Sequence, residues 1–491
     1  MKNIKKVVGA LLTASMVVGL TCGCASTADS GSATVSESSS AAVNENKSTE
    51  AATTQEQVVL DCGISPSDAA TDQEIEAWKG YKERFEEKYP DVVLEENGYQ
   101  YTAESYMALV EAGTEPTIFR AQFTEPPKLI RNKAIKDITD ILEARGWLDK
   151  INPSIKALLS DENGRIYGLP KSGYALGLMI NADLFKEAGL VDEDGYPIYP
   201  KTWDELAETA KTIKEKTGAA GLCLLAKDNS GGWHYSNIAW DYGANLCEDN
   251  GDGTYTAHLD SAEAIAAMEY IKSLKWDYDV LTADPTNEDW SSGFAQLATG
   301  GAAMYITGND AMGQLAKNGL PASSVALAPL PAGPKGQYSL FGGTPYCFGA
   351  SATDDEVNAA LDLLEIMGDA PVASEDVLEG RRADCESKKE QDIAVIPTFP
   401  IWTDEELQKD LDTIIEEYSN VDQKMFSDYF ATVQTEGNLR NEEVGSVQDM
   451  YAELTKVIQA AVTDKDADIP ALMKQANENY QSILDNLYPA K

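Results

Sequence analysis

The chain has 491 residues and a formal net charge of −42 at neutral pH, from 39 basic and 81 acidic side chains. Nucleic acids and anionic lipid surfaces bind proteins through basic faces, so this charge excludes both as principal partners. A chain of this length exceeds the size at which one hydrophobic core is usual, and we therefore expect two lobes.

The first residues have the order of an export signal. A basic start precedes an apolar stretch at 7–20, which is too short to span a bilayer as a permanent helix. The sequence TCGC that follows resembles a bacterial lipoprotein signal, in which the thiol of the first mature residue carries the lipid. Gly23 favours Cys24 over Cys22 as that residue, so we predict a signal peptide at 1–23 and a palmitate-type anchor on Cys24. An ordinary secretory signal with incidental cysteines is the alternative.

A polar segment follows the signal. Residues 24–57 consist mainly of Ala, Ser, Thr, Glu and Asn, which cannot bury enough apolar surface to offset the entropy of ordering them. The sequence predicts a disordered tether between a lipid at the outer face of the cell membrane and a body that begins near Val58. We expect the protein to touch the membrane only through this lipid.

Five more cysteines lie in the body, at wide spacing and without a CxxC pair. This pattern is no disulfide framework, and we expect buried free thiols. The five are Cys62, Cys223, Cys247, Cys347 and Cys385.

In the first third of the body, short apolar runs alternate with segments whose apolar residues recur at helical spacing. Short apolar runs predict strands, and apolar residues at helical spacing predict helices between them. Such βαβ order favours a largely parallel sheet. The expected strands are 58–60, 92–94, 116–119 and 176–180, and the expected helices are 75–85, 103–112 and 135–142.

The remainder continues in the same manner. Thr202 with Glu205, and Asp260 with Glu263, each have the spacing of a helix capping box. A turn at 250–253 favours a hairpin. Further strands are expected at 221–225, 302–306 and 325–328, and further helices at 354–367 and over most of the chain beyond 407.

Three sequence blocks carry a family resemblance. They are GRIYGLP at 164–170, LMINADLFKEAGL at 178–190 and PKTWDEL at 200–206, supported by FAQLATGGAAM at 294–304 and FGGT at 341–344. Their shared order and spacing are far more specific than any one block. Over essentially the whole body, the chain resembles the extracellular solute-binding proteins of ABC importers, specifically the maltose-binding-like carbohydrate group (family 1), in lipoprotein form.

The resemblance implies an α/β fold of the type II periplasmic-binding-protein class, with two lobes, largely parallel sheets and three hinge crossovers. A ligand would bind between the lobes at the carboxyl ends of strands, and hinge bending would close over it. The expected bounds are 58–170 with 346–397 for the N-lobe, 171–345 with 398–491 for the C-lobe, and 170–174, 341–346 and 397–402 for the crossovers.

A sugar offers C–H faces and hydroxyl edges, so its receptor needs flat aromatic rings and planar polar groups. Chain position and the resemblance place such residues at the cleft. The N-lobe and first crossover supply Ser65, Arg120, Gln122 and Tyr174. The remaining candidates are Trp233, Tyr235, Trp240, Trp290, Asn309, Asp310, Gly342, Gly343 and Arg381.

Several candidates have a structural alternative. Trp233 follows two glycines, which favours an exposed loop, whereas Trp240 lies in an expected helix and could equally pack in the core. Trp290 could likewise either contact the ligand or pack in the core. Arg120 could pair with a surface carboxylate, and Arg381 or its neighbour Arg382 could instead mark an acidic sugar.

Catalytic motifs have little support in this chain. Its two histidines, His234 and His258, stand in no HExxH motif, and no Gly-x-Ser-x-Gly elbow is present. A calcium loop near 248–253 would need a bidentate Glu where Leu259 stands, so we predict no metal and no cofactor. We interpret the chain as a monomeric, non-enzymatic receptor that delivers a carbohydrate to ABC permease subunits. A surface glycan hydrolase and a receptor for a non-sugar solute are the alternatives.

Overall fold

The computed structural model describes residues 57–490 except 69, 71 and 436. These residues belong to one compact unit, 56–491. The predicted signal peptide, Cys24 and nearly all of the predicted tether lie outside the described residues. Among the helices that are described, none is long and apolar enough to cross a membrane.

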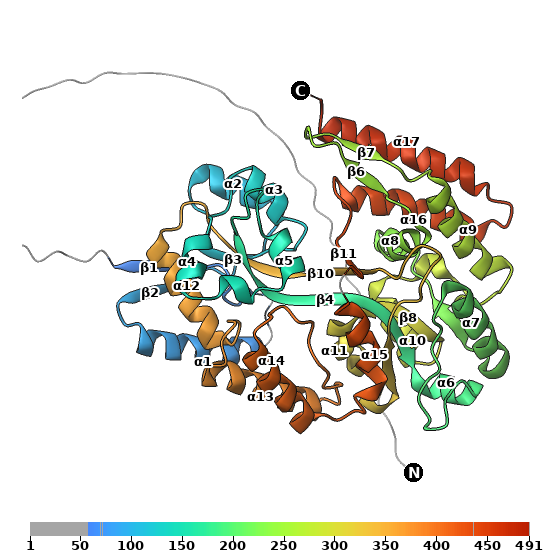
Figure 1. The fold of residues 1–491 in the computed structure, drawn as a ribbon, viewed down its shortest axis with the longest axis horizontal. Coiled ribbons are helices and arrows are strands. Elements are labelled where there is room, and N and C mark those ends of the chain that lie inside the picture. Colours follow the sequence, from blue (N-terminus) through green and yellow to red (C-terminus); the bar gives the residue numbers. More distant parts are fainter. Residues whose placement is uncertain (1–56, 69, 71, 436, 491) are drawn as a thin grey trace, which may run out of the picture. The chain divides into compact units, whose positions relative to one another are not determined.

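One mixed sheet organises the described chain (Figure 1). Its strands follow the order β2-β1-β3-β10-β4-β8-β5, with β11 added to β10 and β9 added to β4, while β6 and β7 form a separate hairpin. The bounds are β1 (Val58–Cys62), β2 (Val92–Glu96), β3 (Ile118–Arg120), β4 (Gly168–Asn181), β5 (Ala220–Cys223), β6 (Cys247–Asp249), β7 (Tyr255–Ala257), β8 (Ala302–Gly308), β9 (Val325–Ala328), β10 (Ser339–Phe348) and β11 (Leu439–Arg440).

Two long strands at the centre of this sheet join its halves. β4 and β10 pair antiparallel from Phe341 opposite Ala175 to Cys347 opposite Gly168. We call the elements on the β1–β3 side the N-lobe and those on the β5 and β8 side the C-lobe. Parallel pairing occurs inside each lobe, between β1 and its neighbours β2 and β3 and between β5 and β8. The sheet is therefore mixed rather than largely parallel, because both joining strands run antiparallel to their neighbours β3 and β8.

The helices cover the two faces of this sheet. In the N-lobe, α1 packs on α12, and α12 packs on β1; in the C-lobe, α8 packs on α9 and α16. The bounds are α1 (Asp72–Lys88), α2 (Ala103–Ala112), α3 (Pro126–Arg131), α4 (Thr139–Ala144), α5 (Pro153–Leu158), α6 (Ala182–Ala188), α7 (Trp203–Thr217), α8 (Ser230–Tyr242), α9 (Ala262–Trp276), α10 (Trp290–Ala298), α11 (Met312–Lys317), α12 (Asp354–Met367), α13 (Glu375–Glu390), α14 (Glu405–Tyr418), α15 (Lys424–Val433), α16 (Val447–Thr463) and α17 (Ile469–Leu487).

Helix starts show where local sequence decides structure. Thr202 caps α7 as predicted, with its hydroxyl oxygen accepting from the Glu205 amide at 3.2 Å. The expected box at Asp260 is wrong by one residue, because Ser261 caps α9 and accepts from the amide of Ala264 at 3.2 Å. The hairpin predicted at 250–253 is confirmed by the pairing of β6 with β7.

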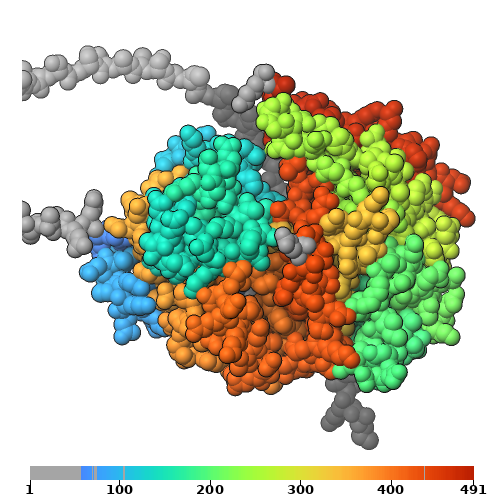
Figure 2. Space-filling view, in the orientation of Figure 1, coloured from blue at the N-terminus to red at the C-terminus, as the bar shows by residue number. Residues whose placement is uncertain are grey.

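A segment between α13 and α14 lies against the joining strands. The Phe399 ring stacks on Phe341 at 6.0 Å, and a Cβ added at Gly173 would lie 2.6 Å from the Phe399 ring. The same segment is tied to the N-lobe, since the amide of Asn152 donates to the carbonyl of Ile401 at 3.0 Å. In Figure 2 the orange surface of α13, α14 and α15 fills the space between the blue-to-cyan N-lobe and the green C-lobe.

The five body cysteines are free and buried, as predicted. Burial raises the pKa of the Cys62 thiol to about 12 and that of Cys247 to about 11. Such thiols remain protonated at neutral pH and pack as small apolar side chains.

Candidate functional site

Tyr174 lies where the two halves of the sheet meet. It belongs to β4 and pairs with Gly342 on β10, while Gly308 on β8 pairs with Leu176, two residues further along β4. A Cβ added at Gly342 would lie 2.6 Å from the Tyr174 hydroxyl oxygen, and one at Gly308 would lie 3.2 Å from the ring. The two glycines therefore leave the space that the tyrosine ring occupies.

Two carboxylates act electrostatically on this ring and a third acts on one of the two, and they come from different parts of the chain. Glu125 lies between β3 and α3 in the N-lobe, Asp310 follows β8, and Glu442 follows β11. The charges of Glu442 and Asp310 both raise the pKa of Tyr174, after desolvation as the main cause. The charge of Glu125 in turn acts on Glu442, so groups from both lobes share one electrostatic environment.

Two tyrosines hold two of these carboxylates. The Tyr101 hydroxyl donates to Glu125 Oε2 at 2.7 Å, and the Tyr451 hydroxyl donates to Glu442 Oε1 at 3.0 Å. We call the resulting set the junction cluster. It consists of Tyr101, Glu125, Tyr174, Asp310, Glu442 and Tyr451.

The junction cluster is anionic. Within the described part of the chain, none of its three carboxylates forms an ion pair with a Lys or Arg side chain. Desolvation raises the pKa of Asp310 and of Glu442. The Asp310 side chain is nevertheless exposed. A carboxylate that is open to solvent and yet surrounded by protein is suited to accept hydrogen bonds from a ligand.

A cavity of ≈ 440 Å³ lies in the N-lobe. Ser65 and Arg120, both predicted as ligand contacts, line it together. Ser65 Oγ accepts from the amides of Asn97 at 3.0 Å and Gly98 at 2.7 Å, and Arg120 donates from Nη2 to the carbonyl of Ile64 at 3.1 Å. The structure brings these two residues to each other rather than to Tyr174.

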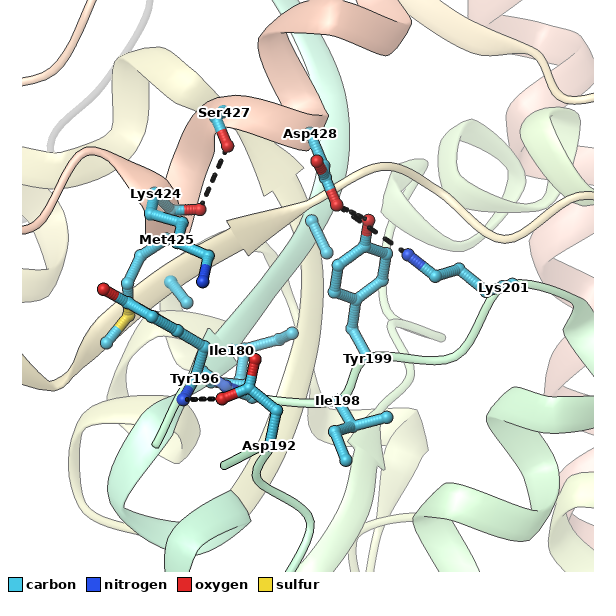
Figure 3. A pocket seen from close by; sticks show the side chains of 13 residues that line it. Ile180, Asp192, Tyr196, Ile198, Tyr199, Lys201, Lys424, Met425, Ser427 and Asp428 are labelled. Atoms are coloured by element: carbon cyan, nitrogen blue, oxygen red, sulfur yellow. Dashed lines mark hydrogen bonds and ion pairs between the residues drawn. The ribbon is translucent and has the colours of Figure 1, made fainter. Parts of the chain in front are cut away.

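A second hollow, of ≈ 270 Å³, lies in the C-lobe between residues 192–201 and α15 (Figure 3). Its polar groups already pair with one another. The Tyr199 hydroxyl bonds to Asp428, whose carboxylate also lies 3.8 Å from Lys201 Nζ. Lys424 lies over the Tyr196 ring at 3.9 Å from its centroid. None of the predicted ligand residues lines this hollow.

The prediction for the aromatic residues near 233 is largely wrong. Their two glycines do not lead into a loop but lie inside α8. Gly232 lets α8 approach α16 closely, since a Cβ added there would lie 2.4 Å from the backbone of Tyr451 on α16. Tyr235 is fully buried and donates to the carbonyl of Ala264 at 2.5 Å. Trp240 is fully buried as well, with Nε1 donating to Glu443 at 2.6 Å. Only Trp233 in this group keeps exposed surface.

Two polar candidates also have structural roles. Asn309 is buried, and its Oδ1 accepts from the amide of Ala175 at 3.2 Å and the hydroxyl of Tyr429 at 3.0 Å. Arg381 pairs with Asp384 of its own helix at 2.9 Å. This pairing removes the basis for reading Arg381 as the mark of an acidic sugar.

The remaining candidates are placed as follows. Gln122 is exposed after β3, and Trp290 is 41% exposed while its ring packs edge-on against Phe294 at 4.8 Å. Gly342 and Gly343 belong to β10, opposite Tyr174 and Gly173. Gly342 therefore leaves space for Tyr174, whereas a Cβ at Gly343 would meet the Ser172 carbonyl and the Phe123 ring.

Sequence reasoning missed four members of the junction cluster. Glu125 and Tyr101 follow β3 and β2, and the rule that ligands gather beyond the carboxyl ends of strands could have found them had it been extended a few residues. Glu442 and Tyr451 carry no such signal. They reach Tyr174 only through the packing of β11 and α16, which joins segments more than 250 residues apart.

Comparison with known proteins identifies the family. A family model described as bacterial extracellular solute-binding protein matches residues 69–374. DasA, the diacetylchitobiose binding protein of Streptomyces coelicolor, is 25% identical over 231 residues, which are 46% of this chain and 48% of DasA. The chain spans about half the length of the curated relatives it matches.

Solved structures bear out the predicted fold class. T. maritima MalE3 with bound maltose has a TM-score of 0.60 and 20% identity, covering 88% of this chain and 99% of MalE3. UgpB from Mycobacterium tuberculosis in complex with glycerophosphocholine also has a TM-score of 0.60, with 16% identity and coverage of 88% and 99%. On the match of the family model and on this shared fold, the chain belongs to the bacterial extracellular solute-binding proteins.

Proposed function

We propose that this protein captures a carbohydrate at the junction cluster and delivers it, as a monomer, to the permease subunits of an ABC transporter. The observation that supports this proposal is the position of Tyr174 on the joining strands, with Asp310 beside the same glycine, Gly308, and with Glu442 and Glu125 linked to it electrostatically. Glu125 comes from the N-lobe, whereas Asp310 and Glu442 come from the other side of the joining strands. A ligand held by all of them would favour the conformation in which the lobes are close together.

The chemistry of the cluster suits a polyol. Carboxylates accept hydrogen bonds from hydroxyl groups, and the Tyr174 ring offers a flat face for the C–H groups of a sugar. Two similar proteins are described with sugar ligands: DasA is a diacetylchitobiose binding protein, and MalE3 was solved with maltose. UgpB was solved with glycerophosphocholine, but three carboxylates without a cationic partner would repel the phosphate group of such a ligand.

A screen of the full chain against neutral, acidic and amino saccharides, with glycerophosphodiesters included, tests this proposal by thermal unfolding. A ligand that binds the native state raises the melting temperature. We expect a neutral saccharide to raise it, with one molecule bound per chain, and to be recovered unchanged. A response to a phosphodiester alone, or to no saccharide, would contradict the proposal. Recovery of cleaved sugar would instead support a hydrolase, which membership of a binding-protein family does not favour.

We further propose that the chain is exported and anchored through lipid on Cys24, with residues 24–57 as the tether at the outer face of the membrane. The support is the sequence order of a basic start, a short apolar stretch and the TCGC motif. Detergent phase partitioning of wild type and Cys24→Ser tests it. We expect the wild type in the detergent phase and the variant in the aqueous phase, and the same phase for both would contradict anchoring at Cys24.

A further inference from the structure

His234 is a buried histidine without a hydrogen-bond partner. It lies in the first turns of α8 and is only 1% exposed. Within the part of the chain that the structure describes, neither of its ring nitrogens has a partner. A neutral imidazole carries one donor and one acceptor, and leaving both buried and unpaired costs free energy. A phenyl ring could fill this space without that cost, so the imidazole adds the capacity to bind a proton rather than stability.

Aromatic rings pack against this imidazole. Its centroid lies 5.0 Å from that of the Trp233 ring and 5.7 Å from that of Tyr305 on β8. Phe294 of α10 in turn packs edge-on against Tyr305 at 5.2 Å. These contacts suit a flat neutral ring, and they supply no acceptor oxygen for the two N–H groups of an imidazolium.

The titratable side chains on this side of α8 are uncharged at neutral pH. Tyr305 donates its hydroxyl to the Trp290 carbonyl at 3.0 Å, and burial raises its pKa. Cys223 on β5 pairs with Tyr305 on β8, and burial raises the pKa of its thiol as well. On α16, burial raises the pKa of Tyr451, so this side chain also stays neutral.

Two carboxylates act on Tyr305 by their charge, but both have partners of their own. Asp289 pairs with Lys227 at 2.7 Å, and Glu288 accepts hydrogen bonds from two neutral side chains of α10. On α9 and β10, the groups that bond to α8 are backbone groups, which do not titrate. Among the described residues, no charged group contributes to the pKa of His234.

The burial of His234 links the first turns of α8 to pH. Burial alone lowers the pKa of His234 to about 3, whereas an exposed histidine has a pKa of about 6.5. Between these values a proton binds to the imidazole only when the turn opens. The closed turn therefore keeps its full stability above about pH 6.5 and loses it as the pH falls toward about 3. The ratio of open to closed molecules rises about tenfold per pH unit, which is about 100-fold by pH 4.5.

The same part of α8 supports a member of the junction cluster. Helices α8 and α16 pack on each other (Figure 1). The Gly232 amide donates to Thr455 Oγ1 at 2.9 Å, and a Cβ added at Gly232 would lie 2.4 Å from the backbone of Tyr451. The Tyr451 hydroxyl donates to Glu442 at 3.0 Å. Opening of this turn would therefore remove a packing partner from Tyr451.

We infer that His234 is an acid-sensitive switch, in which proton uptake by the imidazole opens the first turns of α8 and loosens Tyr451 in the junction cluster. At neutral pH the uncharged ring stays packed between Trp233 and Tyr305, and the turn stays closed. The opening itself needs no ligand. Its effect on solute release rests on the function proposed for the junction cluster.

Amide hydrogen exchange of the full chain at pH 7.5 and pH 4.5, corrected for the pH dependence of intrinsic exchange, tests the opening. We expect the protection of amides 233–237 to fall by about 100-fold more in the wild type than in His234→Phe, which cannot bind the proton. His234→Leu should behave as His234→Phe does, so the test stands if one of the two variants fails to fold.

The other histidine of the chain offers a matched control. His258 is exposed, and its Nε2 lies 3.2 Å from Glu248. His258→Gln should lose protection in α8 as the wild type does. Asp241, at the far end of α8, has a pKa raised by burial to about 8, but it is present in every variant and cancels in the difference.

Release of the saccharide found in the screen tests the link to the junction cluster. In stopped-flow experiments at pH 4.5, the wild type should release it up to about 100-fold faster than His234→Phe, because release follows the open population. At pH 7.5 the two proteins should release it at the same rate.

Three results would overturn the inference. An equal loss of protection in the wild type and His234→Phe would exclude the switch. So would an imidazole that titrates near pH 6.5 in the folded protein, observed by NMR in His258→Gln, where His234 is the one histidine left. Equal release rates beside a confirmed difference in exchange would exclude the link to Tyr451. A failed saccharide screen would contradict the proposed function instead, and the exchange measurement would still decide whether His234 opens α8.

Discussion

Helix α8 and the junction cluster differ in the way that their side chains meet solvent. The aromatic side chains of α8 are dense in sequence, but Tyr235 and Trp240 are fully buried and bond to groups inside the C-lobe. The junction cluster is sparse in sequence, but it leaves polar groups such as Asp310 open where the lobes meet. A cluster of aromatic residues in sequence therefore indicates a core as readily as a binding site.

Trp240→Ala should produce the largest effect, and it should be an effect on stability. A fully buried indole contributes about 3–5 kcal/mol to the free energy of unfolding. Urea unfolding measures the loss, with Trp233→Ala on the same helix as the partly buried control and Trp240→Phe as a milder variant. The folded fraction should bind solute with unchanged affinity. Weakened binding at unchanged stability would place Trp240 at the ligand and break the comparison.

The second prediction concerns Asp241, at the buried end of α8. Burial raises its pKa to about 8, although it accepts hydrogen bonds from Trp203 Nε1 at 2.9 Å and the Tyr338 amide at 2.6 Å. In the unfolded chain its pKa is about 4. The stability from its protonated form is therefore complete below about pH 4 and is lost as the pH rises through about 8, at roughly 1.4 kcal/mol per unit between them.

Denaturant unfolding from pH 4 to 9 tests this linkage by the difference between the wild type and Asp241→Asn. The wild type should lose more stability than the variant as the pH rises, because the amide does not ionise. Parallel profiles would show that Asp241 is ionised in the native state throughout this range.

Much of the fold could be predicted from the sequence because its signals are local. The end points of α12 and the cap of α7 follow from polar residues next to apolar stripes, and the structure has both as expected. β4 was expected only at 176–180, and it begins at Gly168 because its first half pairs with β10. That pairing joins segments far apart in the chain, which local periodicity does not report.

The candidate site was harder to predict for the same reason. Tyr174 and Asp310 were expected at the cleft, and both belong to the junction cluster. Asn309, the residue beside Asp310, has a structural role, because it begins a 3-10 helix just after β8 and its Oδ1 accepts from the amide of Ala175. Glu442 could not be found without knowing that α16 returns to the joining strands.

Tyr174→Ala should weaken solute affinity by about tenfold, because it removes the ring that would stack on a sugar. Calorimetric titration with the saccharide found in the screen measures the change. Tyr196→Ala is the matched control, because Tyr196 lines the C-lobe hollow of Figure 3 instead. Equal affinities for Tyr174→Ala and the wild type would remove the junction cluster from the solute site.

Trp233→Ala should have the smallest effect, a few-fold loss of affinity. The His234 ring lies beside it, with ring centroids 5.0 Å apart, and Trp233 is partly buried, so only the exposed part of the indole could meet a ligand. The same titration measures this change. A loss of affinity larger than that of Tyr174→Ala would indicate that the solute lies against α8 rather than against the joining strands, which would contradict the comparison above.

A crystal structure of the full chain with the saccharide that most raises its melting temperature tests the central claim most directly. The account predicts a sugar ring against Tyr174, with hydroxyl groups donating to Asp310 and Glu442 and with Glu125 of the N-lobe in reach. A saccharide bound in the N-lobe cavity or the C-lobe hollow, with the junction cluster empty, would contradict it.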